Sequence, residues 1–127
     1  MLGMAMSGQF RLGLRLLAVL AQGPGTMHTS GAIAEELGES AVVVRRMFLL
    51  LHQAGLIEQK KGPNGGARLS VPAKQIGLGA VYSAVTPGWL VLGDPAVDSA
   101  MKKVRGAAVE AMNETSLAAV VKKMKKV

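Results

Sequence analysis

The sequence predicts a mainly α-helical protein that carries one small β hairpin. Half of the 127 residues are hydrophobic but only 3% are aromatic, so aliphatic and methionine side chains must build the core, which favours helices. Glycine and proline clusters divide the chain into short segments, most of which carry apolar residues at helical spacing. Residues 56–71 instead have the pattern of two short strands around a glycine-rich turn.

The length corresponds to one small domain with an extension, which we place at residues 7–75 and 76–127. Fifteen lysine and arginine residues against eight aspartate and glutamate residues give a formal charge of +7. This charge suits a polyanionic partner, with nucleic acid favoured over an anionic membrane.

The absence of cysteine excludes disulfides, thiolate catalysis and Cys-ligated zinc or iron–sulfur sites. His28 and His52 are far apart in sequence, and no metal site is expected from them.

The first two predicted helices lie on either side of a glycine-proline turn. Apolar residues recur at helical spacing in the first segment, residues 10–22: Phe10, Leu14, Leu17 and Ala21. The uninterrupted apolar run there, residues 16–21, is too short for a signal peptide or a membrane span, so we expect a cytoplasmic protein. The second helix is predicted over Ser30 to Leu37, with Thr29 or Ser30 as N-cap and Gly38 as its stop.

The third helix is predicted to begin after the N-cap Ser40 and to continue to about Ala54, before Gly55. Steps of 100° place one apolar face around Met47 toward the core: Val43, Val44, Leu50, Leu51 and Ala54. The opposite face and its flanks carry the remaining side chains: Val42, Arg45, Leu49 and His52, with Ala41, Arg46 and Phe48 beside them. The exposed first turn therefore combines small apolar residues with two arginines.

The two strands are predicted at residues 56–61 and 67–71. Lys60, Lys61 and Arg68 flank the turn between them. From residue 40 to residue 74 there are six basic residues against a single acidic one, Glu58. Most of the excess positive charge therefore lies on the third helix and the hairpin.

The last part of the chain is predicted to be helical. A helix of roughly residues 76–85 is followed by a long helix with Asp94 as N-cap and Pro95 at its first position. The apolar residues of the long helix alternate four and three positions apart: Val97, Met101, Val104, Ala108 and Ala111 or Met112. This narrow seam suits pairing with a helix of a second copy, and packing within the monomer is the alternative. A short helix is predicted from Glu114 to about Met124.

Three helices followed by a basic two-stranded hairpin is the order of a winged helix-turn-helix. In that fold the start of the third helix enters the major groove and the hairpin reaches neighbouring phosphates. The residues expected to contact DNA lie at these places: Thr29, Ser40, Ala41, Val42, Arg45, Arg46, Lys60, Lys61, Asn64 and Arg68. Arginine pairs with guanine, and valine or alanine touches a thymine methyl group. The alternatives are that the arginines lie on a solvated helix face without a partner, and that the lysines of the hairpin protect an edge strand from aggregation.

Several fragments, in order along nearly the whole chain, carry a family resemblance: Ile33–Gly38, Val42–Met47, Ala54–Ile57, Gly62–Leu69 and Ile76–Val85. In these fragments the sequence resembles the Rrf-two (Rrf2) family of bacterial winged-helix transcription regulators. The resemblance implies a transcriptional regulator, with repression favoured, that binds a palindromic operator as a homodimer. It also implies that the long late helix crosses its partner.

The sequence departs from that family between the fourth helix and the long helix. Many members carry three cysteines there that hold a cluster, whereas residues 87–105 contain no cysteine. The resemblance is thus to the cluster-less branch, and no cofactor is expected. The activity of the protein would then be regulated by a small ligand, by a protein partner or by its own abundance. Trp89 is a candidate for lining a ligand pocket, with plain hydrophobic packing as the favoured alternative.

Other functions are less well supported by the sequence. An enzyme is not expected, because the carboxylates fall on helix faces and termini, and no helix follows Gly62–Gly66 to make a phosphate-binding loop. The main alternative is a winged-helix module for protein contact that does not bind DNA, with Phe48 and Leu49 as its exposed surface. The basic run Lys122–Lys126 is better explained as a solvated C-terminus than as a membrane anchor.

Overall fold

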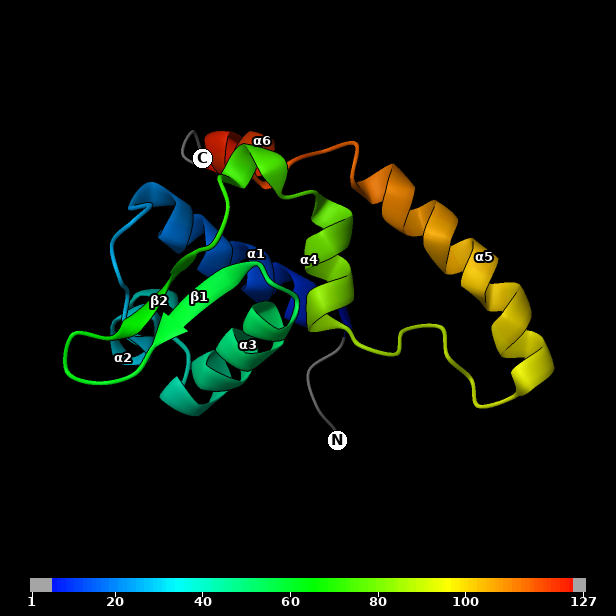
Figure 1. Cartoon of the computed structure of the whole chain (residues 1–127), viewed down its shortest axis with the longest axis horizontal. Coiled ribbons are helices and arrows are strands. Elements are labelled where there is room, and N and C mark those ends of the chain that lie inside the picture. The colour runs from blue at the N-terminus through cyan, green and yellow to red at the C-terminus, as the bar shows by residue number, and fades with distance from the viewer. Residues whose placement is uncertain (1–5, 125–127) are drawn as a thin grey trace.

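The computed structural model describes residues 6–124, and over this range the chain is mainly helical with one antiparallel hairpin (Figure 1). The elements in order are α1 (Met6–Gln22), α2 (Ser30–Leu37), α3 (Ala41–Gln53), β1 (Ile57–Lys60), β2 (Gly66–Leu69), the 3₁₀ turn η1 (Ala73–Gln75), α4 (Leu78–Val85), α5 (Pro95–Met112) and α6 (Leu117–Met124). The predicted fold class is confirmed. Lys125 and Lys126 of the predicted basic run lie outside the described residues.

The helix α1 lies at the centre of the hydrophobic core, in contact with α2, α4, α6 and β2. Of the predicted apolar stripe, Leu17 is fully buried, whereas Phe10, Leu14 and Ala21 pack at the edge of the core. The other buried residues of α1 lie outside that stripe: Leu12, Gly13, Leu16, Ala18, Val19 and Leu20. The predicted stripe thus belongs to the core, but the buried face of α1 is wider than the stripe, because a helix surrounded by several neighbours buries most of its circumference.

The helices α2 and α3 begin and end where the local sequence predicts. The Thr29 hydroxyl accepts a hydrogen bond from the Ala32 N–H at 3.0 Å, which makes Thr29 the N-cap of α2. Gly38 ends α2 in the left-handed conformation, with φ 69°, that a residue without a Cβ adopts easily. The Ser40 hydroxyl caps α3 by accepting from the Val43 N–H at 3.2 Å.

The buried face of α3 is turned toward Phe48 relative to the face that the sequence predicts. It comprises Val44, Met47, Phe48 and Leu51, and α3 contacts α2, α4 and β1. Phe48 is only 3% exposed, so its predicted place on an exposed flank was wrong: neighbours on several sides enclose it. Ala54 is exposed, in contrast to its predicted core position, because α3 ends at Gln53 and Ala54 is the C-cap.

The hairpin is joined to the helices through its second strand. β1 and β2 pair in antiparallel register, with Glu58 opposite Arg68 and Gln59 opposite Ala67. On the other edge of β2, His28 and Ala67 exchange two backbone hydrogen bonds of 2.9 Å each. The loop between α1 and α2 thus covers the edge of β2 and fixes the hairpin against the helices.

The helix α5 extends away from the rest of the molecule and packs against α4 (Figure 1). The approach is close at Gly79, where an added Cβ would lie 2.7 Å from the Asn113 Oδ1 and closer still to the Val109 carbonyl oxygen. Asn113 Oδ1 accepts from the Ala80 N–H at 3.1 Å. Side chains of α4 and α6, such as Val81 and Leu117, belong to the same core cluster as α1.

Over residues 6–124, no helix combines the length and the apolar character needed to cross a membrane.

We expect Gly79→Ala to lower the free energy of unfolding by about 1–3 kcal/mol, because the new methyl group would force α4 and α5 apart. Thermal or denaturant unfolding followed by circular dichroism measures this effect. Gly106→Ala on α5 is the matched control, since its Cβ would meet no atom within 4 Å and alanine favours a helix by about 0.5–1 kcal/mol over glycine. A Gly79→Ala variant as stable as Gly106→Ala would contradict the close packing.

Candidate nucleic-acid interface

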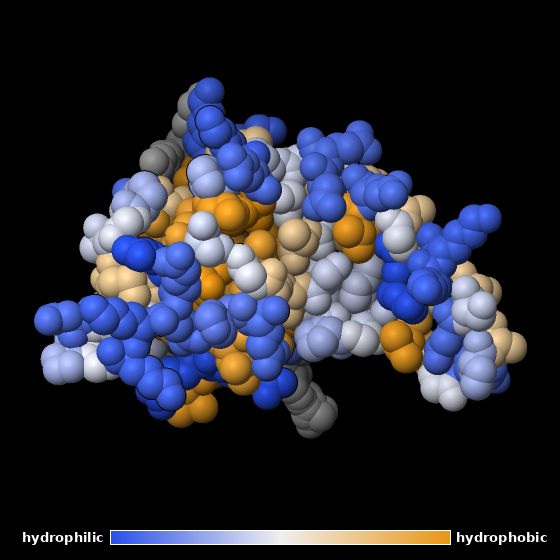
Figure 2. All heavy atoms as spheres, viewed as in Figure 1, coloured by the Kyte–Doolittle hydropathy of each residue, from blue (hydrophilic) through white to orange (hydrophobic). Residues whose placement is uncertain are grey.

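The exposed face of α3 combines aliphatic and cationic side chains. Val42 is 67% exposed and Leu49 is 51% exposed, and Arg45 and Arg46 are exposed between them. At 100° per residue these four positions lie within a stripe about 100° wide. Figure 2 shows hydrophobic atoms at the surface beside the beginning of α3, bordered by hydrophilic side chains. Of the predicted groove-facing residues, Val42, Arg45 and Arg46 thus share one exposed face, whereas Ala41 is half-buried and packs against the core.

The two arginines have different surroundings. Arg46 lines a hollow of about 200 Å³ with Gln9 of α1, Leu50 of α3 and Pro87, which follows α4. Arg45 lies 100° away around the helix axis, on the other side of Val42. The two side chains therefore have distinct environments in the structure, whereas the sequence alone did not distinguish them.

The hairpin carries the predicted basic residues at its surface. Lys60, Lys61 and Asn64 are exposed. Arg68 donates from its Nε to the Glu58 Oε2 at 2.8 Å, and the two side chains are 45% and 51% exposed. An ion pair this exposed contributes little to stability, but it offsets the charge of Arg68. Lys60 and Lys61 are thus the cations of the hairpin that lie outside the ion pair.

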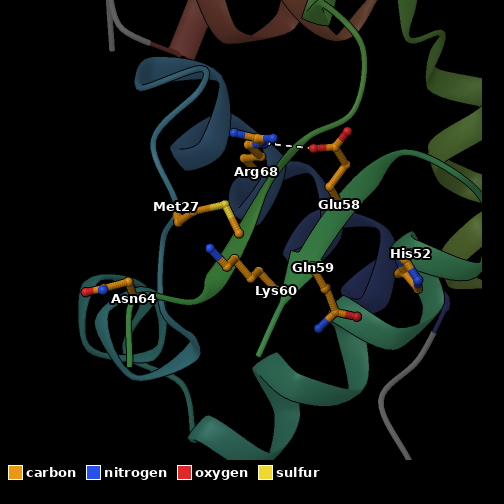
Figure 3. A pocket seen from close by; sticks show the side chains of 7 residues that line it. All are labelled: Met27, His52, Glu58, Gln59, Lys60, Asn64 and Arg68. Carbon is orange, nitrogen blue, oxygen red and sulfur yellow. Dashed lines mark hydrogen bonds and ion pairs between the residues drawn. The ribbon is translucent and has the colours of Figure 1, made fainter. Parts of the chain in front are cut away.

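A depression of about 540 Å³ is lined mainly by the hairpin, together with the end of α3 and the loop before α2 (Figure 3). Its lining includes the predicted residues Lys60, Asn64 and Arg68. The other lining residues were not predicted as part of the site: Met27, His52, Glu58 and Gln59. The hairpin register, which sets Glu58 opposite Arg68, was the signal available for Glu58. Met27 lies before α2, and no sequence pattern connected it with the hairpin.

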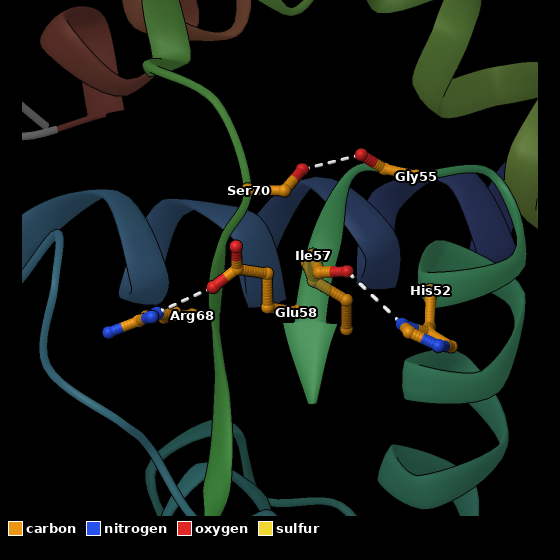
Figure 4. A network of polar contacts seen from close by, with 6 residues as sticks. All are labelled: His52, Gly55, Ile57, Glu58, Arg68 and Ser70. Carbon is orange, nitrogen blue, oxygen red and sulfur yellow. Dashed lines mark hydrogen bonds and ion pairs between the residues drawn. The ribbon is translucent and has the colours of Figure 1, made fainter. Parts of the chain in front are cut away.

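Two polar contacts attach the hairpin to the end of α3 (Figure 4). The His52 Nδ1 donates to the Ile57 carbonyl oxygen at 3.2 Å, and because a carbonyl only accepts, Nδ1 carries the proton. The Ser70 hydroxyl donates to the Gly55 carbonyl oxygen. These bonds span the turn between α3 and β1 and hold the helix and the hairpin at a fixed relative position.

The seam predicted on α5 is partly exposed within residues 6–124. Val97 is 39% and Val104 is 47% exposed, and Met101, Ala108 and Met112 are half-buried. Val109 and Asn113, which approach α4, lie about 100° and about 140° around α5 from the centre of this seam. The face of α5 with the five seam residues is therefore separate from the face that contacts α4.

Trp89 packs within the molecule. Its ring lies edge-to-face on Tyr82, with centroids 5.0 Å apart, and Tyr82 lies in the same way on Phe10, also at 5.0 Å. This contact is of the hydrophobic kind that the sequence analysis favoured. A ligand pocket at Trp89 stays a prediction.

A helix-turn-helix with a basic hairpin, next to an exposed helix start that carries arginines, defines a protein of the winged-helix regulator class. Comparison with known families agrees with this assignment. The model of the Rrf2 family, described as iron-dependent transcriptional regulators, matches residues 6–123. The chain belongs to the Rrf2 family.

Individual relatives are similar over parts or all of the chain. The HTH-type transcriptional regulator IscR of Vibrio campbellii is 40% identical over 53 residues, which is 42% of this chain and 32% of that relative. The matched segment thus spans about a third of that relative's length. The crystal structure of the oxidized form of CymR from Staphylococcus aureus is 28% identical in sequence to this chain and has a TM-score of 0.68. The similarity covers 93% of this chain and 96% of that chain. CymR (YrzC), the global cysteine regulator of B. subtilis, has 24% identity and a TM-score of 0.70, with 97% and 98% covered, and shares the fold.

The family description mentions iron, and the residues of this chain do not fit an iron site. The sequence contains no cysteine to supply thiolates for a cluster. Within residues 6–124, no three side chains among histidine, aspartate and glutamate come close enough to hold a metal ion. The donor set of an iron–sulfur cluster is therefore missing from the sequence itself.

We expect Ser40→Ala to lower the free energy of unfolding by about 1 kcal/mol, because the Val43 N–H at the start of α3 loses its acceptor. Ser40→Asp restores an acceptor and should retain most of the stability. Chemical denaturation of the three proteins measures both effects. Equal stability of Ser40→Ala and the unchanged protein would mean that the hydroxyl does not hold the first turn of α3.

Proposed function

We propose that this protein is a DNA-binding transcriptional regulator that acts as a homodimer on a palindromic operator, without an iron–sulfur cluster, and that repression is its favoured mode. The observation that carries the proposal is the exposed face of α3, with Val42 and Arg45 at its first turns, fixed beside the cationic hairpin. Regulators of this kind are not enzymes and act in the cytoplasm, where bacterial DNA lies.

The arrangement assigns different roles to the cations. Arg45, which is exposed and does not line the hollow of Arg46, is placed to form two hydrogen bonds with a guanine in the major groove. Lys60 and Lys61 of the hairpin are placed for phosphates, which carry no sequence information. Arg46, which lines the hollow next to Gln9, is farther from the base edges in this assignment.

The homodimer rests on the seam of α5. An apolar stripe that is exposed at Val97 and Val104 loses its contact with water when a second α5 packs against it. A two-fold dimer presents two copies of α3, which bind half-sites one helical turn apart, about 34–36 Å from centre to centre. Palindromy of the operator follows from that symmetry.

The alternative, a winged-helix module for protein contact, keeps one supporting observation. Leu49 is 51% exposed, whereas Phe48, the other residue of that surface, is buried. The salt dependence of binding to duplex DNA separates the two functions, because phosphate contacts give a steep negative slope. A module that binds protein alone would show no such slope.

We expect Arg45→Ala to weaken operator binding by about 1–3 kcal/mol and to relax the preference at one base pair, since a two-bond contact with guanine is lost. Arg46→Ala should leave the base preference unchanged. Affinities for the operator and for single-base variants, measured by fluorescence anisotropy, test both. Relaxed preference in Arg46→Ala but not in Arg45→Ala would reverse the assignment.

Lys60→Ala and Lys61→Ala should instead weaken binding to all duplexes alike and reduce the slope of log affinity against log salt by about one unit each. Titrations over a salt series measure the slope. If Arg45, Arg46, Lys60 and Lys61 can all be changed to alanine without loss of duplex binding, the DNA-binding function is wrong and protein contact takes its place.

We expect the protein to be dimeric at micromolar concentration, and Met101→Lys to dissociate it, because a lysine in the apolar seam would be buried without a partner. Ser99→Lys, on the opposite side of α5, is the matched control and should remain dimeric. Analytical ultracentrifugation of the three proteins gives the result. A folded Met101→Lys dimer would show that the seam is assigned wrongly.

A further inference from the structure

We infer that Val42 is a specificity-determining residue that reads the C5 methyl group of a thymine in each half-site. This inference rests on the proposed function and extends it from the class of partner to the chemistry of one base contact. It concerns a side chain that has no role in the packing of the protein.

The first observation is the exposure of Val42. At 67% it is the most exposed of the large hydrophobic residues in the described range, whereas Val44, two positions later, is fully buried. A β-branched residue is also not favoured on an exposed helix surface, where alanine or a long polar residue suits the helix better. Neither core packing nor helix propensity explains a valine at this position.

The second observation is its place in α3. Val42 is the second residue of the helix, two positions after the N-cap Ser40, so it lies in the first turn. When a helix enters the major groove by its N-terminal end, side chains of the first turns meet the base edges. The Ser40 hydrogen bond and the contacts of α3 with the hairpin fix the direction of this turn.

The third observation is the distance between Val42 and Arg45 along the helix. Three residues correspond to about 4.5 Å of rise and 60° of rotation, so the two side chains point from the same face. Successive base pairs are about 3.4 Å apart, so residues at this spacing reach neighbouring base pairs. If Arg45 reads a guanine, the methyl groups of Val42 lie over an adjacent step.

The chemistry of the groove then selects the base. Valine neither donates nor accepts a hydrogen bond, so it gains nothing from the amino, carbonyl and ring nitrogen groups that distinguish the other bases. The C5 methyl of thymine is the apolar group of the major-groove edge. Contact between it and Val42 removes both from water, which corresponds to about a four-fold gain in affinity for each methyl group.

The experiment uses the full chain and an operator obtained by selection from a random duplex library. In that operator each thymine is replaced, one symmetric pair at a time, by deoxyuridine, which removes the methyl group and keeps the O4 acceptor. Affinities are measured for the unchanged protein, Val42→Ala and Leu49→Ala. Leu49 is a matched control, because it is also exposed on this face but lies about 10.5 Å farther along α3.

We expect one thymine pair at which uracil weakens the unchanged protein by about ten-fold or more, roughly four-fold for each half-site. Val42→Ala should bind the thymine and uracil duplexes equally, whereas Leu49→Ala should keep the difference. Circular dichroism of Val42→Ala should match that of the unchanged protein, because no core contact is removed.

The outcomes separate the inference from the proposed function. A selected operator that lacks thymine, or that tolerates uracil at every position, overturns the reading by Val42 and leaves DNA binding intact. A uracil effect that persists in Val42→Ala, or disappears in Leu49→Ala, also overturns it. If selection yields no preferred sequence and duplex binding shows no salt dependence, the proposed function itself is wrong.

Discussion

The burial of α1 is the constraint on which the rest of the structure depends. In a chain with so few aromatic side chains, this helix supplies leucines that neighbours must cover from several directions. Gly13 leaves room for Val85 of α4 and Met47 of α3 to approach α1 together, because a Cβ there would lie 3.0 Å from one side chain and 3.7 Å from the other. Gly13 thus lets α4 pack closely on α1, and α3 in turn packs on α2, α4 and β1. The opposite face of α3 remains exposed.

The candidate site lies on the exposed face of α3 and on the hairpin beside it. The backbone bonds between His28 and Ala67 hold the hairpin from one side, and the His52 and Ser70 contacts hold it from the other. These contacts fix the backbone that carries the lysines and arginines of the hairpin and α3. Binding of these side chains to a polyanion therefore requires little rearrangement of the backbone. The candidate site therefore combines charge with exposed aliphatic side chains, as the proposed recognition of DNA requires.

Features decided within a few residues were predictable from the sequence. Caps and stops such as Thr29, Gly38 and Asp94 depend on local hydrogen bonds and backbone conformation, and these appear in the structure where they were expected. The burial of Phe48 and the full width of the buried face of α1 were not predictable, because they depend on how many neighbours surround each helix. The exposed face of α3 and the basic hairpin could be found by pattern, whereas Met27 enters the site only through the tertiary fold.

The aromatic stack of Phe10, Tyr82 and Trp89 has an optical consequence. Trp89 is the one tryptophan of the chain, and its ring packs where α4 gives way to the segment that leads to α5. The intrinsic fluorescence of the protein on excitation of tryptophan therefore arises from a single place, between the winged-helix part and the projecting helix. Its emission wavelength reports how well that junction is shielded from water, without any added label.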